Sequence, residues 1–230
     1  MAKSLIIKEL ANGTVDTITA LKRTKVLLSN LDNKEIISWI NHEISGYPND
    51  VKLPSYRTTQ GSLVGSYFKG SMVNHIKYNN VPLPLGNMPD DIKEKLLCIE
   101  FREGVESLEK LLIKSQNNEI AKVVPADFYP AIAKYNNDMY MIISSAKVVF
   151  ENEFIRNVIS SVENKLLDIL ILLEKEYGSL DDLDIDTSKA TDEELNSITQ
   201  EIYVIIYNDN SISIGNDNKI NHTDITTSKN

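Results

Sequence analysis

The sequence predicts an α+β fold: a mainly helical domain with a small irregular β-sheet, one long amphipathic helix, and a C-terminal β-hairpin or β-roll. Three observations support this fold class. Apolar residues recur at helical spacing in residues 3–46 and again in residues 151–177. Residues 55–86 are instead rich in β-forming residues, glycine and proline. An eight-residue repeat of Asn-Asp-Asn turns with alternating isoleucines follows residue 207, which is typical of short strands.

The N-terminal part of the chain predicts a compact three-helix unit spanning residues 3–46. The spacing of apolar residues places its helices at residues 3–11, 15–31 and 33–45. Asn33 is a suitable N-cap for the third helix, since its side chain can accept from the first backbone N–H groups. Gly46 is a suitable terminator, because glycine adopts left-handed backbone at low cost.

The middle of the chain predicts a β-rich segment, residues 55–86, followed by a helical segment, residues 88–178. The β-rich segment holds two short strands and a third at residues 74–78. In the helical segment the apolar spacing slips in phase near residue 99. Residues 90–113 are therefore either one helix, or a helix and a strand that feed a second helix. A short helix near residue 130, an extended run before residue 150 and a long amphipathic helix complete the segment.

The C-terminal part predicts an acidic linker, residues 179–200, and a β-forming tail, residues 201–230. The linker is highly charged and poor in apolar residues, so we expect a mobile segment with at most one helical turn. Residues 202–207 are β-branched and aromatic and resemble a strand. A single hairpin is marginally stable in water, so the tail is expected to pair with other subunits of a homo-oligomer. The residues expected to mediate this self-association are Ile205, Tyr207, Ile212, Ile214 and Ile220.

Charge is divided unevenly along a chain whose net charge is −9. The first 88 residues contain ten lysines and arginines against six acidic residues, a balance of +4, and the remainder carries fourteen against twenty-seven, a balance of −13. This is not the overall composition of a nucleic-acid-binding domain. Solvated surface lysines are the simpler interpretation, although a local basic face remains open, from Lys22, Arg23, Lys25, Lys69 and Lys77. The sequence has no run long enough for a membrane span or a signal peptide, which predicts a cytoplasmic protein without membrane contact.

Standard catalytic and cofactor motifs are absent from the sequence. There is no P-loop, no dinucleotide-binding glycine pattern, no HExxH, no GxSxG and no paired CxxC. The three histidines, His42, His75 and His222, fall on different predicted elements, so a zinc site built from them is not expected. The single cysteine, Cys98, lies among aliphatic residues and resembles a buried hydrophobe. We therefore expect no cofactor and no bound metal.

Chemically distinctive residues concentrate at the end of the third predicted helix and in the loop after it. As acid–base groups, Glu43, His42 and Arg57 are the candidates, because imidazole and carboxylate side chains serve in proton transfer. The alternative is a structural corner in which the aromatic rings clamp the loop and Arg57 pairs with Glu43 or stacks on Tyr47. The residues that would line a binding pocket are Trp39, Tyr47, Tyr56 and Arg57.

The same stretch resembles a known signature. Residues 39–47, Trp-Ile-Asn-His-Glu-Ile-Ser-Gly-Tyr, and residues 53–57, Leu-Pro-Ser-Tyr-Arg, resemble the WxNxELxGY and LPxYR motifs of the AbiTii-like family. Weaker similarity extends the resemblance over roughly residues 3–177. Ile44 and Ser45 depart mildly from the family's usual leucine and asparagine.

The resemblance implies a role in bacterial abortive infection, in which an infected cell stops growing before phage mature. It brings no established catalytic residues with it. We therefore expect a defence protein that acts as a sensor or a toxic effector through protein interaction, with a phage protein or a nucleic acid among its partners. Two alternatives stay open: an enzyme or binder directed at nucleic acid, and a receptor for a nucleotide second messenger.

Overall fold

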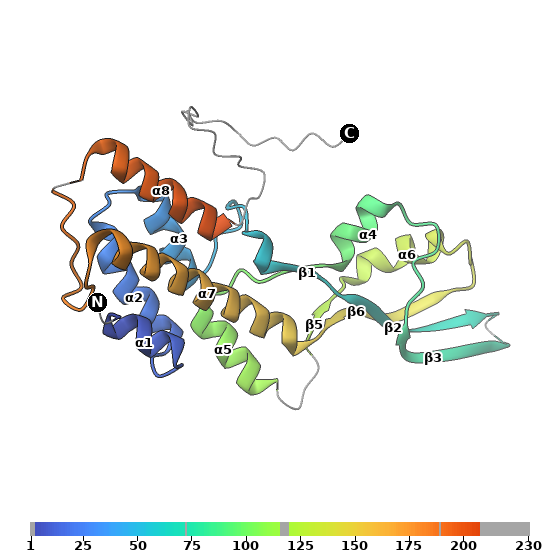
Figure 1. Cartoon of the computed structure of the whole chain (residues 1–230). Helices are drawn as coiled ribbons and strands as arrows, with labels where there is room; N and C mark the ends of the chain where they lie inside the picture. Colours follow the sequence, from blue (N-terminus) through green and yellow to red (C-terminus); the bar gives the residue numbers. More distant parts are fainter. Residues whose placement is uncertain (1–2, 72, 116–119, 189, 208–230) are drawn as a thin grey trace.

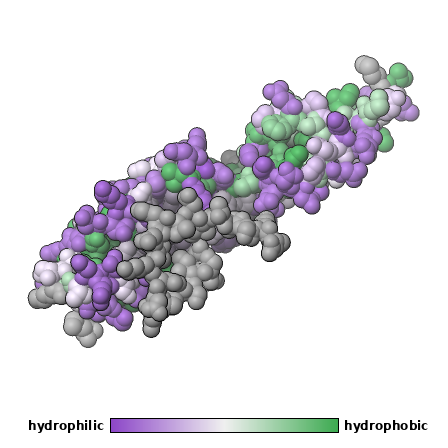
Figure 2. All heavy atoms as spheres, turned by 90° about the horizontal axis from the view of Figure 1, so that it is seen from above, coloured by the Kyte–Doolittle hydropathy of each residue, from purple (hydrophilic) through white to green (hydrophobic). Residues whose placement is uncertain are grey.

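The molecule is elongated and has two lobes, as Figure 1 and Figure 2 show from two directions. The computed structural model describes residues 3–71, 73–115, 120–188 and 190–207. We call the helix-rich end the helical lobe and the end that holds the sheet the β lobe. This arrangement confirms the predicted α+β class with a small antiparallel sheet.

The predicted three-helix unit is confirmed at the N-terminal side of the helical lobe. It contains α1 (Leu5–Ala11), α2 (Thr17–Ser29) and α3 (Lys34–Ser45). The side chain of Asn33 accepts from the backbone N–H of Ile36 at 3.1 Å, so it caps α3 as expected. Gly46 follows the last turn with a φ of +99°, a backbone conformation that favours glycine.

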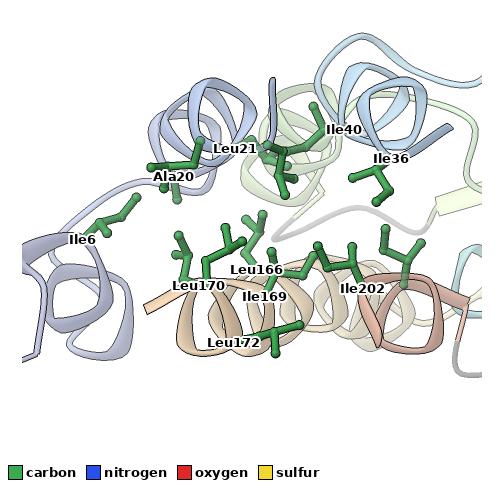
Figure 3. Packing of buried hydrophobic residues seen from close by; sticks show 14 of the residues in the cluster. Ile6, Ala20, Leu21, Ile36, Ile40, Leu166, Ile169, Leu170, Leu172 and Ile202 are labelled. Carbon is green, nitrogen blue, oxygen red and sulfur yellow. The ribbon is translucent and has the colours of Figure 1, made fainter. Parts of the chain in front are cut away.

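Two further helices of the helical lobe are α7 (Asn152–Tyr177), the predicted long amphipathic helix, and α8 (Asp192–Tyr207). The layer formed by α1, α2 and α3 packs on α7 and α8 through a hydrophobic core (Figure 3). The residues that meet there are Ile6, Ala20, Leu21, Ile36 and Ile40 on one side, with Leu166, Ile169, Leu170 and Ile202 on the other. Burial of this aliphatic surface is the main force that holds the lobe together.

The strand predicted at residues 202–207 is wrong, because these residues form the last turns of α8. Local β propensity favoured a strand, but Ile198, Ile202 and Ile206 recur every four residues and are buried on one helix face. Packing against the core has overridden propensity. Thr191 and Glu194 also form a capping box at the N-terminus of α8, with Glu194 accepting from the Thr191 N–H at 2.8 Å.

The prediction of a mobile acidic linker at residues 179–200 is also wrong, both in secondary structure and in packing. Leu180 and Ile185 are buried in the helical core. Two acidic side chains dock the segment: Asp181 accepts from the Leu5 N–H at 2.6 Å, and Asp184 accepts from the Asn30 side-chain amide at 2.6 Å. The segment therefore wraps the helical lobe, while the domain boundary predicted at residue 178 stays a prediction.

The β lobe begins with a short 3-10 turn, η1 (Ser55–Arg57), and holds two sheets. In the smaller one, β1 (Thr58–Gln60) pairs with β4 (Cys98–Glu100). The larger one is antiparallel, with the order β3-β2-β6-β5. Its strands are β2 (Ser62–Gly70), β3 (His75–Pro82), β5 (Ile120–Val123) and β6 (Ile142–Phe150). The predicted β-rich segment is thus confirmed, and a later extended run supplies a third long strand.

The remaining helices lie between these strands in sequence: α4 (Asp90–Leu97), α5 (Val105–Lys114), η2 (Ala126–Phe128) and α6 (Tyr129–Tyr135). The open question at residues 90–113 resolves as helix, strand, helix. A second hydrophobic core forms between one face of the larger sheet, α5, α6 and the first turns of α7. The long helix α7 therefore contributes to both cores and joins the two lobes.

The residues predicted to mediate self-association divide into two groups. Ile205 packs partly against the helical core, and Tyr207 at the end of α8 is 43% exposed. Ile212, Ile214 and Ile220 lie outside the described residues, as does the predicted hairpin or β-roll. In the part of the chain that is described, no helix is long and apolar enough to span a bilayer.

Candidate functional site

The distinctive residues at the end of α3 and in η1 come together in one buried cluster. We call it the junction network; its residues are Trp39, Glu43, Tyr47, Tyr56 and Arg57. Trp39 and Glu43 occupy the same face of α3, one turn apart, as a spacing of four residues requires. The loop after Gly46 returns η1 to that face. The sequence predicted this gathering.

The Glu43 carboxylate is the centre of the junction network. One oxygen, Oε1, accepts from the Tyr47 hydroxyl and the Tyr56 hydroxyl at 2.6 Å each, and from Arg57 Nε at 3.1 Å. The other, Oε2, accepts from Arg57 Nη2. Trp39 Nε1 donates to the Tyr56 hydroxyl at 2.9 Å and extends the chain of donors. A buried carboxylate is stable only with such a full set of partners.

The Arg57 guanidinium is equally enclosed. Its Nη1 donates to the backbone carbonyl oxygens of Phe101 and Glu103 at 2.7 and 2.8 Å. Its Cζ lies 4.8 Å from the centre of the Tyr47 ring, within cation–π range. Both predicted contacts of Arg57, with Glu43 and with Tyr47, are therefore present.

The charges and protons in the cluster are fixed by burial and by the ion pair. Burial, reinforced by the charge of Glu43, raises the pKa of both the Tyr47 and Tyr56 hydroxyls, so each stays protonated and donates. Burial lowers the pKa of Arg57, but hydrogen bonding to Glu43 and its charge outweigh that effect and raise it. The side chains of Glu43 and Arg57 are both 0% exposed.

The junction network lies where the two lobes meet. The Tyr47 N–H donates to the Arg102 carbonyl at 2.7 Å, and the Arg57 carbonyl accepts from the Phe101 N–H at 2.9 Å. The backbones cross so closely that a Cβ on Gly104 would stand 2.3 Å from the Ile44 carbonyl oxygen. Arg57 thus ties α3 of the helical lobe to the β4–α5 connection of the β lobe.

Accessible space exists beside the network rather than within it. A shallow, open depression is lined by Ser45, Gly46, Tyr47, Pro48, Arg102, Glu103, Gly104 and Ser107. Of the network residues, Tyr47 borders it. His42 is half-buried, with its ring centre 4.9 Å from that of Tyr47. The candidate acid–base trio is therefore brought close together, but Glu43 and Arg57 face each other and not solvent.

Other candidate features of the sequence do not converge on this site. Lys22, Arg23 and Lys25 lie on α2, whereas Lys69 and Lys77 lie on the larger sheet of the other lobe, so they form no single basic face. His75 begins β3, and His222 lies outside the described residues. Among the residues with described positions, no three His, Cys, Asp or Glu side chains are grouped to hold a metal ion.

One contributor to the junction was missed by the sequence reasoning. Lys165 of α7 places Nζ 5.1 Å from the Tyr56 ring centre and donates to the Ile205 carbonyl at 2.6 Å. Burial lowers the pKa of this lysine despite the nearby carboxylates. Its position on the apolar side of α7, one residue before Leu166, was the available signal. Lys165 links the network to the end of α8.

Comparison with known protein families gives a match over most of the chain. The model of the AbiTii family matches residues 4–199, which include the junction network, the whole β lobe and the first half of α8. No curated protein and no solved structure matches the chain.

Proposed function

We propose a function from the premise that this chain belongs to the AbiTii family, which is associated with abortive infection and phage defence. The chain is accordingly a phage-defence protein. Its action depends on binding a partner, as a sensor or a toxic effector. The junction network serves as the structural joint between the lobes and not as a reaction centre.

The observation that carries this proposal is that the charged side chains of the motif are enclosed in a self-contained ion pair. Glu43 and Arg57 have no exposed side-chain surface, and each is bonded within the protein. A general base must reach the proton that it removes, within about 3 Å or through one water. A carboxylate that already accepts from two hydroxyls and a guanidinium is held in place for architecture instead.

Phage challenge at several growth temperatures tests the structural role. We expect Glu43→Gln to weaken defence as the folded fraction of the protein falls, and to regain defence at lower temperature. His42→Ala, a change beside the network, should leave both the unfolding temperature and defence nearly unchanged. A Glu43→Gln protein that is fully folded yet gives no protection at any temperature contradicts the proposal and favours catalysis.

Self-association is the second part of the proposal. It rests on the alternating isoleucines beyond α8, at positions 212, 214 and 220. Because Ile205 and Tyr207 belong to α8, the segment that associates begins after them. Deletion of residues 208–230 is expected to lower the mass measured by light scattering to that of a single chain. An unchanged mass rules out the tail as the site of association.

A second candidate function is recognition of nucleic acid, and a specific observation favours it. The larger sheet carries lysines on all four strands and no carboxylate on any of them. Among the described helices, α4, α5, α7 and α8 instead begin with acidic residues in the first turn. Helix α2 also carries three cations and no carboxylate, with Arg23 paired to Glu9 at 2.5 Å. Charge on the larger sheet therefore favours an anionic partner there.

A further inference from the structure

The charge of the larger sheet differs from that of the whole chain. Its strands contain Lys69, Lys77, Lys122 and Lys147 and no aspartate or glutamate, in a chain of net charge −9. Residues 51–89, which include β2 and β3, contain no acidic residue at all. Lys69 pairs with Asp138 at 3.4 Å, and Lys122 donates to the Cys98 carbonyl. Lys77 and Lys147 lie on one face of the sheet.

The two faces of the sheet have different surroundings. Leu63 and Tyr67 of β2, with Ala146 and Val148 of β6, point into the second hydrophobic core. Side chains alternate along a strand, and residues directly opposite each other share a face. The intervening residues therefore form the other face, which we call the open face. Its members include Val64, Ser66, Phe68, His75, Lys77, Ile142 and Lys147.

The open face is arranged in two rows across the strands. In the first row Lys77, Phe68 and Ile142 lie side by side on β3, β2 and β6. Val64 and Lys147 are opposite each other in the second row, four residues along β2 and therefore about 13 Å away. Each row combines a cation with an apolar group. Ile142 is 59% exposed and lies at the end of β6 that does not pair with β5.

Phe68 is the centre of the first row. Lys77 Nζ lies 5.6 Å from its ring centre, and the His75 ring meets it edge-on at 5.2 Å. Phe68 is half-exposed on a central strand, with the side chains of His75 and Lys77 beside it. Such a ring offers a stacking surface with adjacent positive charge. A sheet that merely faced water would carry polar side chains at these positions.

We propose that the open face binds single-stranded nucleic acid, with bases stacked on Phe68 and Ile142 and a phosphate near Lys77. Charge complementarity favours this occupant, because lysine is depleted at the centre of protein interfaces but is typical of phosphate contacts. A single strand is required, since bases in a duplex have no free ring face. The inference rests on the proposed binding function and names the chemical class of its partner.

Fluorescence anisotropy of the full chain with labelled 20-nucleotide oligo(dT) and oligo(U) tests this assignment and separates DNA from RNA. We expect binding at about 50 mM salt that weakens as salt rises, with a logarithmic slope of about −0.7 for each phosphate neutralised. A 20-base-pair duplex of matched length should compete poorly. Absence of binding to both oligonucleotides at low salt overturns the proposal.

Two variants locate the binding surface. Lys77→Glu and Phe68→Ala should each weaken binding by about tenfold or more. Lys22→Glu on α2 is the matched control, because it makes the same charge change in the other lobe, and it should alter affinity less than twofold. Lys77 is exposed, so its variant stays informative even where Phe68→Ala lowers stability. Equal weakening by Lys77→Glu and Lys22→Glu shows a non-specific charge effect and overturns the site.

Phage challenge with the same variants separates this inference from the proposed function. Loss of defence by Lys77→Glu together with loss of oligonucleotide binding supports both. Loss of defence from a protein that binds no oligonucleotide overturns the nucleic-acid assignment, because the open face then serves an acidic protein or another partner, and the proposed binding function stands. Oligonucleotide binding that Lys77→Glu abolishes without any effect on defence supports the site and contradicts its role in defence.

Discussion

The junction network and the open face use similar residue types in opposite ways. In the network a carboxylate, a guanidinium and two phenols are enclosed and bonded to one another. On the open face the His75 ring meets Phe68 edge-on and Lys77 Nζ lies over the Phe68 ring, and all three side chains stay accessible from solvent. The network resembles an active site by composition, whereas the open face carries no recognised motif. Solvent accessibility, and not residue type, distinguishes a structural cluster from a candidate binding surface.

This contrast has an energetic basis. A buried charge is tolerated only when its partners replace the water that it lost, so each partner in the network is needed for stability. An exposed lysine keeps its hydration and contributes little to folding. Changes in the network should therefore alter stability first, and changes on the open face should alter binding first.

Removal of the central carboxylate is expected to have the largest effect. Glu43→Ala leaves the Arg57 charge buried and two tyrosine hydroxyls without their acceptor, which should cost about 3–5 kcal/mol in the free energy of unfolding. The matched control is Glu9→Ala, which removes the partly exposed Glu9–Arg23 ion pair and should cost less than about 1 kcal/mol. Urea denaturation measures both. Similar losses in the free energy of unfolding for the two variants would show that burial does not determine how much an ion pair stabilises the protein.

The core contacts of α8 come next. Ile202→Ala removes a side chain that is fully buried between α8 and the helical core, and should destabilise the protein by about 3 kcal/mol. Ile171→Ala on α7 deletes the same atoms from a position that is 39% exposed, so a loss below about 1 kcal/mol is expected. Equal losses in thermal unfolding would contradict the packing of α8 on the lobe.

A single hydroxyl of the network should have a smaller but measurable effect. Tyr56→Phe leaves Trp39 Nε1 without an acceptor and Glu43 with one donor fewer, at a cost of about 1–2 kcal/mol. Tyr140→Phe, at a residue that is 64% exposed, serves as the control and should change stability by less than about 0.5 kcal/mol. Equal stabilities of the two phenylalanine variants in urea denaturation would show that the Tyr56 hydroxyl does not stabilise the network.

The smallest expected effect is a pH dependence at the N-terminus of the helical lobe. Burial raises the pKa of Glu174, but hydrogen bonds from Lys3 and Ser4 outweigh it and lower the pKa from 4.5 to about 2. A lowered folded-state pKa contributes stability that is present above about pH 4.5 and lost as pH falls towards 2. Because Lys3 is 54% exposed and solvent screens the pair, the contribution should be about 1 kcal/mol.

Glu174→Gln separates this carboxylate from the other acids in the molecule. The variant should be less stable than the parent at pH 7 and nearly equal to it at pH 2, since the protonated carboxyl no longer attracts Lys3. Denaturant unfolding at both pH values gives the difference. A stability gap that is the same at pH 7 and pH 2 would assign the effect to shape and not to charge.

The parts of the fold that the sequence predicted well depend on local signals. The helices of residues 3–46 follow from apolar spacing, from the Asn33 cap and from Gly46 at the end. The pairing of Glu43 with Arg57 was one of two readings of the motif, and only the three-dimensional structure shows that both side chains are fully enclosed. Burial is a property of what packs around a residue, here the loop that contains Phe101 and Glu103, and is invisible in the motif itself.

The parts that the sequence predicted poorly depend on distant contacts. Residues 202–207 have strand propensity, and their helical form comes from burial of Ile202 and Ile206 against helices far away in sequence. The acidic segment before α8 was expected to be mobile, yet Leu180 and Ile185 anchor it. The open face was likewise hidden, because Phe68, Lys77 and Ile142 become neighbours only through the register of three strands.

Protection against phage by two folded variants, measured side by side as plating efficiency, tests the central claim most directly. The variants are Tyr56→Phe in the junction network and Lys77→Glu on the open face, produced at equal levels and below the unfolding temperature of both. If the junction network is structural and the open face binds the partner, Tyr56→Phe keeps protection and Lys77→Glu loses it. Protection lost by folded Tyr56→Phe and kept by Lys77→Glu would contradict the account.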